Sequence, residues 1–178
     1  MYPVNLRGRL VRVREFRHDD IDDALHVVGD DRVTTWLSFD SRSLAATVDM
    51  ITGAIERARQ EPRTEYYLAV ADGTDALIGF VRLGFAGVKA AKLGYAIRAD
   101  RWGMGYATDA CRTMIEFGFT ALGLHRISAA IGPDNTASIA VVRRLGMTHE
   151  GRLRDHVFTN GGWRDSELFA ILQHEASA

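Results

Sequence analysis

The chain has 178 residues, of which 47% are hydrophobic and 25% charged, and its formal net charge is −1. This length suits one domain with a sizeable core, so we expect a single domain over 1–178. The balanced charge argues against a basic nucleic-acid binder and against a protein drawn to anionic membranes.

The N-terminal part of the sequence predicts one strand and two helices. It begins "MYPVNLRGRLVRV", without the apolar core of a signal peptide, and we expect a cytoplasmic protein with no membrane contact. Alternation of apolar residues with Arg predicts a strand over 8–16. Helical spacing predicts helices over 19–28 and 40–60. The buried face of the second helix is expected to hold Leu44, Val48, Ile51 and Ile55.

The segment "TTWLSF" between these helices is apolar but falls in an expected loop. Two interpretations of its aromatic residues stay open. Trp36 and Phe39 either plug the edge of the core or form the wall of a pocket.

The central part predicts three strands followed by a long helix. The strands cover 65–71, 76–85 and 90–98, and their short connections make them antiparallel neighbours. The helix runs from Gly105 to about Leu122. Cys111, the only cysteine, lies on its apolar stripe, which favours a buried small hydrophobe over a nucleophile.

The C-terminal part predicts a strand over 125–131, a helix that begins at the cap "GPDNTAS", and a closing pair of strands. Asn160-Gly161 between these last strands is a strong hairpin signal. The complete order is strand, two helices, three strands, helix, strand, helix and hairpin. It predicts an α+β fold with one central sheet, without the regular alternation of a doubly wound fold.

Two glycines stand out in "RADRWGMGYATDA" at 98–110, where a strand leads through a loop into a helix. Unpaired N–H groups at such a helix start favour an anion, and Gly103 and Gly105 would let a phosphate approach them. A tight structural turn is the alternative explanation. Thr108 replaces the third glycine of a dinucleotide fingerprint, and no Gly-Lys-Ser/Thr follows as in a P-loop.

The motifs "LGYAI", "RWGMGYATDA", "DNTAS", "RLGM" and "NGGWRDS" occur in this order and spacing. Through these motifs the chain resembles the GNAT-superfamily N-acetyltransferases, and the resemblance covers its whole length. The chain is most similar to their RimJ/RimL-type branch, which acetylates ribosomal-protein N-termini. The resemblance implies a GNAT fold, in which helices flank a single mixed, mostly antiparallel twisted sheet. It also implies acetyl-CoA as cosubstrate.

Residue by residue, the resemblance implies a cleft between the strands that end near Ile97 and Ile131. Tyr95 and Ile97 match the strand edge that pairs with the pantetheine arm. Asn135 matches a residue that hydrogen-bonds this arm, and Arg143 matches a basic position near the adenosine phosphates. The loop that holds the pyrophosphate matches Trp102, Gly103, Met104, Gly105, Tyr106 and Ala107.

Coenzyme A is polyanionic, and Arg98, Arg101, Arg143 and Arg144 lie in the motifs expected around it. A solvated surface role is the alternative for at least two of these arginines.

The resemblance also implies catalytic roles. The Ile97 N–H would polarise the acetyl carbonyl. The tyrosine that many relatives use to protonate the leaving thiolate is replaced by Val142, so Ser138 is the candidate donor, unless it only caps its helix.

The general base is less well defined, because Lys92 stands where many relatives carry Glu. Asp155 and His156 are the candidates, and at most one of them can serve because neighbours on a strand face opposite sides. A surface role for each is the alternative.

The histidines show no metal-ligand spacing, and no Gly-x-Ser-x-Gly elbow is present, so we expect neither a metal nor a covalent acyl-enzyme. The sequence thus predicts an N-acetyltransferase that transfers acetyl directly to a primary amine in a ternary complex. The expected acceptor is an α-amine, at a protein N-terminus or on a small amino compound. A non-catalytic acyl-CoA-binding module and an acetyltransferase for a small molecule, such as an antibiotic or an amino acid, are the alternatives. A homodimer is possible.

Overall fold

The structure, a computed structural model, describes residues 1–176 as eight strands with helices between them. The strands are β1 (Asn5–Arg7), β2 (Arg12–Arg14), β3 (Glu65–Ala71), β4 (Leu77–Phe85), β5 (Ala90–Ile97), β6 (Arg126–Ile131), β7 (Thr148–Thr159) and β8 (Gly162–Leu172). The α-helices are α1 (Ile21–Val28), α2 (Asp31–Thr34), α3 (Leu44–Ala58), α4 (Tyr106–Thr120) and α5 (Thr136–Arg144). Short 3-10 turns cover His18–Asp20 and Ala99–Arg101.

The eight strands form one sheet in the order β1-β2-β3-β4-β5-β6-β8-β7. Every neighbouring pair is antiparallel except β5 and β6, which run parallel. This arrangement confirms the predicted α+β class with a mixed, mostly antiparallel sheet. None of the helices in residues 1–176 has the length and apolar character needed to cross a membrane.

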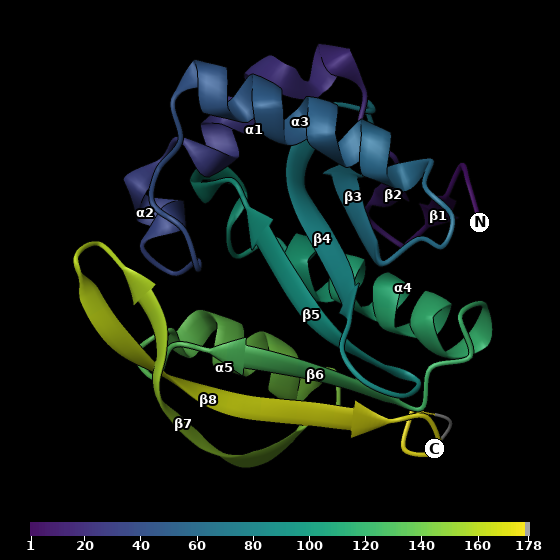
Figure 1. The fold of residues 1–178 in the computed structure, drawn as a ribbon, viewed down its shortest axis with the longest axis vertical. Helices are drawn as coiled ribbons and strands as arrows, with labels where there is room; N and C mark the ends of the chain where they lie inside the picture. The colour runs from purple at the N-terminus through teal and green to yellow at the C-terminus, as the bar shows by residue number, and fades with distance from the viewer. Residues whose placement is uncertain (177–178) are drawn as a thin grey trace.

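Helices cover both faces of the sheet, and the alternation of side chains along each strand supplies both cores. Leu68 and Val70 of β3 pack in the cluster that contains α4 and α5, whereas Ala69 between them packs in the cluster under α1 and α3. Figure 1 shows α1 and α3 over one side of the sheet and α4 behind it. Cys111 lies fully buried in the α4 core, as predicted, and burial raises the pKa of its thiol.

The first strand differs from the prediction. Only Arg12–Arg14 pair with β3, and the predicted start at Gly8 is a turn in which Gly8 N–H donates to Val11 O at 2.8 Å. The buried Asp109 carboxylate of α4 accepts the Leu10 and Val11 N–H groups at 2.7 and 3.1 Å. This long-range contact favours the turn over a longer strand.

The phase of the α3 stripe was also wrong. Leu44 and Val48 are exposed, at 53% and 37%, whereas Ile51 is buried as predicted. The buried face consists of Thr47, Ile51, Ala54 and Ala58. Small residues lie against the sheet because the helix packs closely on it. The pattern of large apolar residues alone did not predict this buried face.

Candidate active site

A cavity opens where β5 and β6 separate. The two strands pair only from Ala90–Lys92 to Arg126–Ser128, and beyond these residues they diverge (Figure 1). The space between them is a cavity of about 1000 Å³, large enough for a cofactor-sized ligand. Its walls come from β5, the β5–α4 loop, β6, α5, the loop after α2 and the β7–β8 hairpin. The predicted cleft near Ile97 and Ile131 is therefore present.

The main chain of β5 borders this cavity along one edge. Arg98 N–H donates to Ile78 O at 2.9 Å, and Ile97 stands opposite Gly79 in the same ladder. Because bonded and non-bonded pairs alternate in an antiparallel ladder, the N–H and C=O groups of Tyr95 and Ile97 turn away from β4. They face the side from which β6 has separated, and apart from Ile97 O, which accepts the Trp102 indole N–H, they can bind an extended ligand.

The two glycines of the β5–α4 loop adopt left-handed backbone conformations, with φ of +76° at Gly103 and +84° at Gly105. Gly105 is the N-cap of α4, and no side chain caps this helix. The first helical hydrogen bond runs from Asp109 N–H to Gly105 O. The N–H groups before Asp109 therefore have no partner within the helix, an arrangement that favours binding of an anion. The positive φ values confirm the tight turn, and the anion site stays a prediction.

Of the predicted loop residues, Met104 lies outside the cavity lining, and five line it. These five are Trp102, Gly103, Gly105, Tyr106 and Ala107. The Trp102 indole Nε1–H donates to Ile97 O at 2.7 Å. The Trp102 side chain therefore braces the loop against β5.

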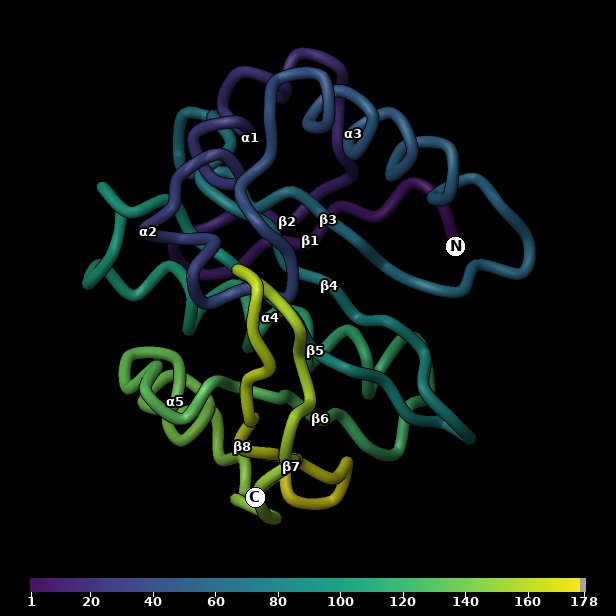
Figure 2. The backbone as a smooth tube through the Cα atoms, turned by 60° about the vertical axis from the view of Figure 1, so that its left-hand side comes forward, coloured from purple at the N-terminus to yellow at the C-terminus, as the bar shows by residue number. Residues whose placement is uncertain are grey.

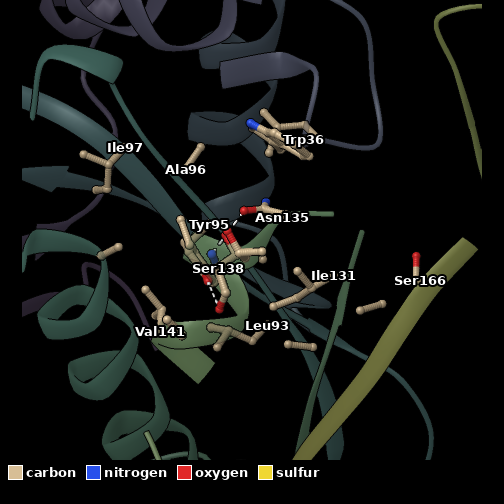
Figure 3. Close-up of a pocket in the computed structure, with 18 of the residues that line it drawn as sticks. Trp36, Leu93, Tyr95, Ala96, Ile97, Ile131, Asn135, Ser138, Val141 and Ser166 are labelled. Carbon is tan, nitrogen blue, oxygen red and sulfur yellow. Dashed lines mark hydrogen bonds between the residues drawn. The ribbon is translucent and has the colours of Figure 1, made fainter. Parts of the chain in front are cut away.

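Helix α5 brings Asn135 and Ser138 to the opposite wall, as Figure 3 shows. Asn135 Oδ1 accepts the Ser138 N–H at 3.1 Å and is the N-cap of the helix. Ser138 thus gives the cap only its backbone N–H, and its hydroxyl is not the capping group. The interpretation of Ser138 as a helix cap is therefore wrong.

Tyr95 connects β5 to α5 beside this wall. Its phenol donates to Ser138 O at 3.3 Å, and burial raises its pKa, so the phenol stays protonated at neutral pH. Val142 is completely buried and packs in the core. Its neighbour Val141 lines the cavity instead.

The far end of the cavity lies between the loop after α2 and the β7–β8 hairpin. Trp36 lines it and Phe39 packs into the core under α1 and α3, so each interpretation of "TTWLSF" holds for one residue. His156 also lines it, with Nδ1 3.0 Å from the hydroxyl of Ser166. Ser166 is 2% exposed and was not predicted from the sequence.

Asp155 is not brought to the cavity. The β7–β8 register shifts between Leu153 and Val157, and Asp155 in this bulge has a φ of +46°. Its N–H donates to Asp165 Oδ1 at 3.0 Å, and its exposed side chain lies outside the lining. Of the two predicted base candidates, the structure thus places only His156 at the cavity.

The arginines of the motifs divide into two groups. Arg101 and Arg144 line the cavity, and Arg143 does not. Arg98 forms ion pairs with Asp100 at 2.8 Å and with Asp23 at 3.6 Å, so carboxylates already balance its charge. A second cavity of about 390 Å³ adjoins the glycine loop, and Arg144 lines it together with Arg9 and Arg112.

The charged residues at the cavity wall are mostly basic, and one of them, Arg101, pairs with Asp72 at 3.7 Å. Lys92, Arg101, Arg144 and Arg164 line it, whereas Asp134 is the single carboxylate among the lining residues of the described chain. Within residues 1–176, no group of three or more His, Cys, Asp or Glu side chains is placed to hold a metal ion.

The geometry of this site agrees with comparisons to known proteins. The sequence model of the acetyltransferase (GNAT) domain family matches residues 11–148. The chain is 30% identical over 168 residues to the uncharacterized N-acetyltransferase p20 of Bacillus licheniformis. This match covers 92% of this chain and 93% of that protein.

Two solved structures share the fold. Mycobacterium smegmatis RimJ in complex with CoA-disulfide has a TM-score of 0.87 and 25% identity, and the match covers 99% of this chain and 91% of that one. Spermidine N-acetyltransferase from Vibrio cholerae, in complex with CoA and spermine, has a TM-score of 0.81 and 20% identity, with 95% and 99% covered.

The splayed strands, the uncapped glycine-loop helix and the family match lead to one conclusion. The chain belongs to the GNAT acetyltransferase family and is an acetyl-CoA-dependent N-acyltransferase.

Proposed function

We propose that the protein transfers the acetyl group of acetyl-CoA directly to an α-amine, at a protein N-terminus or on a small amino compound. The observation that carries this proposal is the charge of the cavity wall. Lys92 lines the cavity, and Asp134 is the single carboxylate among the described lining residues. Such a wall supplies no acidic group at β5 to deprotonate or bind a strongly basic amine.

The α-amine is the acceptor that needs least help from a base. At pH 7 an α-amine of pKa about 7.7–8.0 is roughly 10–15% neutral, whereas a lysine ε-amine of pKa about 10.4 is about 0.04% neutral. The α-amine therefore offers over two orders of magnitude more free nucleophile. A small amino compound with a similar amine, such as an amino acid, stays within the proposal.

The cosubstrate supplies the acetyl group as a thioester, and the residues of the cavity bind and position it. The N–H groups of the glycine loop and the first turn of α4 would bind the pyrophosphate, with Arg101 and Arg144 adding positive charge. The free amide N–H₂ of Asn135 and the Tyr95 main chain would hold the pantetheine arm. We assign the phosphate contacts to Arg144 rather than to Arg143, because Arg144 lines both cavities.

Three groups would act on the reacting atoms. The Ile97 N–H would donate to the acetyl oxygen as negative charge develops there. The Ser138 hydroxyl would give its proton to the departing thiolate and take one back from solvent water. His156, held by Ser166, would accept the proton that the amine loses, either directly or through one water. Proximity in one cavity supplies the rest of the acceleration.

A polyamine such as spermidine is the acceptor that distinguishes α-amine transfer from the competing function, polyamine acetylation. Spermidine carries several positive charges, and the mostly positive cavity wall disfavours it. We expect kcat/KM at pH 7 for a peptide with a free N-terminus and blocked lysines to exceed that for spermidine by at least about tenfold. Steady-state rates with saturating acetyl-CoA measure this ratio. A higher kcat/KM for spermidine would contradict the proposal.

A further inference from the structure

Arg164 of β8 joins two segments that lie far apart in the sequence. Its Nη1 donates to Thr35 O at 2.7 Å and its Nη2 donates to Leu37 O at 2.9 Å. These two carbonyls flank Trp36, the aromatic residue that lines the far end of the cavity. One guanidinium therefore binds the carbonyl groups of the residues immediately before and after Trp36.

The two carbonyls are the groups that a helix end leaves without partners. Trp36 N–H donates to Val33 O and Leu37 N–H to Thr34 O, so the chain continues α2 as tight turns and then stops. The last carbonyls of such a turn need donors from elsewhere, and an arginine fork supplies two at once.

The Arg164 guanidinium makes its hydrogen bonds to the Thr35 and Leu37 carbonyls and to no carboxylate among the described residues. No ion pair engages it among the described residues, and its Nε is buried without a hydrogen-bond partner there. Its stem passes Gly132 at the end of β6, where an added Cβ would lie 3.7 Å from Arg164 Cδ and Nε. This half-buried guanidinium is held by its hydrogen bonds to the two carbonyls and not by a carboxylate.

A second contact ties the same loop to the same hairpin. Asn160 N–H, at the tip between β7 and β8, donates to Asp40 Oδ1 at 2.8 Å. Figure 2 shows the end of this hairpin beside the loop that follows α2. The hairpin and the loop thus meet at two points, and Arg164 is the one nearer the cavity.

We infer that Arg164 is a positioning residue that fixes the Trp36 loop and so shapes the acceptor end of the cavity. It touches neither the glycine loop nor α5 through a hydrogen bond among the described residues. Its loss should therefore affect the binding of the amine and leave the binding of acetyl-CoA unchanged. The kinetic part of this inference rests on the proposed function, but the fixing of the loop does not.

The test compares Arg164→Met with the unmodified protein in two measurements. The first is hydrogen–deuterium exchange of the backbone amides of 35–39, read by mass spectrometry without any substrate. We expect exchange about tenfold faster in the variant, because the Thr35 and Leu37 carbonyls lose their donor and the segment is less restrained. The second is KM, which should rise about tenfold for the free-N-terminus peptide and change less than about twofold for acetyl-CoA.

Arg154→Met is the matched control, since Arg154 is an exposed arginine of the same hairpin and should behave as the unmodified protein. Arg164→Lys keeps the charge but not the fork, and should give intermediate exchange and an intermediate peptide KM. If Arg164→Met does not fold, Arg164→Lys carries the test.

Unchanged exchange at 35–39 in a folded Arg164 variant would overturn the inference. Faster exchange with an unchanged peptide KM would overturn its acceptor part. A wild-type protein that acetylates only other amines would instead refute the proposed function, while the exchange result would still decide whether Arg164 holds the loop.

Discussion

Gly105→Val is expected to raise the dissociation constant for acetyl-CoA by at least about tenfold, or about 1.4 kcal/mol. Gly105 has a φ of +84° and is the uncapped N-cap of α4. A β-branched residue is strongly disfavoured in this conformation, so the loop must change shape and the N–H groups at the start of α4 must lose their common direction. Isothermal titration calorimetry with acetyl-CoA measures the effect.

Gly123→Val is the control for backbone strain. Gly123 also has a positive φ, +62°, and an added Cβ would meet no atom within 4 Å. It lies outside the cavity lining, so this variant should lose stability but keep its affinity for acetyl-CoA. Equal affinity in a folded Gly105→Val protein would refute the assignment of the glycine loop to the pyrophosphate.

Ser138→Ala is expected to lower kcat by about 100-fold and to change the dissociation constant of acetyl-CoA by less than about threefold. A hydroxyl that protonates the thiolate acts only as the thiolate departs, and its loss therefore appears in turnover and not in binding. Steady-state kinetics together with calorimetry separates these two quantities.

The control for Ser138→Ala is a measurement of the free energy of unfolding, with Asn135→Ala as the comparison variant. Asn135 and not the Ser138 side chain is the cap, so Asn135→Ala should lower the free energy of unfolding by about 1 kcal/mol. Ser138→Ala should lower it by less than about 0.5 kcal/mol. If Ser138→Ala instead raises only the KM for acetyl-CoA, then Ser138 is a binding residue and not the proton donor.

Local signals in the sequence were sufficient for most of the fold. Asn160 and Gly161 both have positive φ, and Thr159 pairs with Gly162 across the two-residue turn, as the hairpin signal predicted. The three central strands pair as neighbours because their connections are short. The glycine loop was recognisable since both the backbone conformation and the helix start depend on adjacent residues.

The acceptor end of the cavity could not be predicted, because long-range contacts build it. Arg164 binds a loop 127 and 129 residues away, and no local pattern marks it. The prediction treated Asp155 and His156 as neighbours on a regular strand, yet a bulge places Asp155 outside the lining. Ser166 has no signal at all, since a buried serine on a strand looks like any other polar residue.

The most direct test of α-amine transfer uses two peptides at pH 7 with acetyl-CoA in excess. One has a free N-terminus and a blocked lysine, and the other has a blocked N-terminus and a free lysine. We expect faster acetylation of the first by about two orders of magnitude, with a rate that climbs as pH rises through the α-amine range of about 7.7–8.0. Faster acetylation of the lysine peptide at pH 7 would contradict the proposal, because it would require a base besides His156 that deprotonates a lysine ammonium, and β5 places Lys92 and no carboxylate in the described lining.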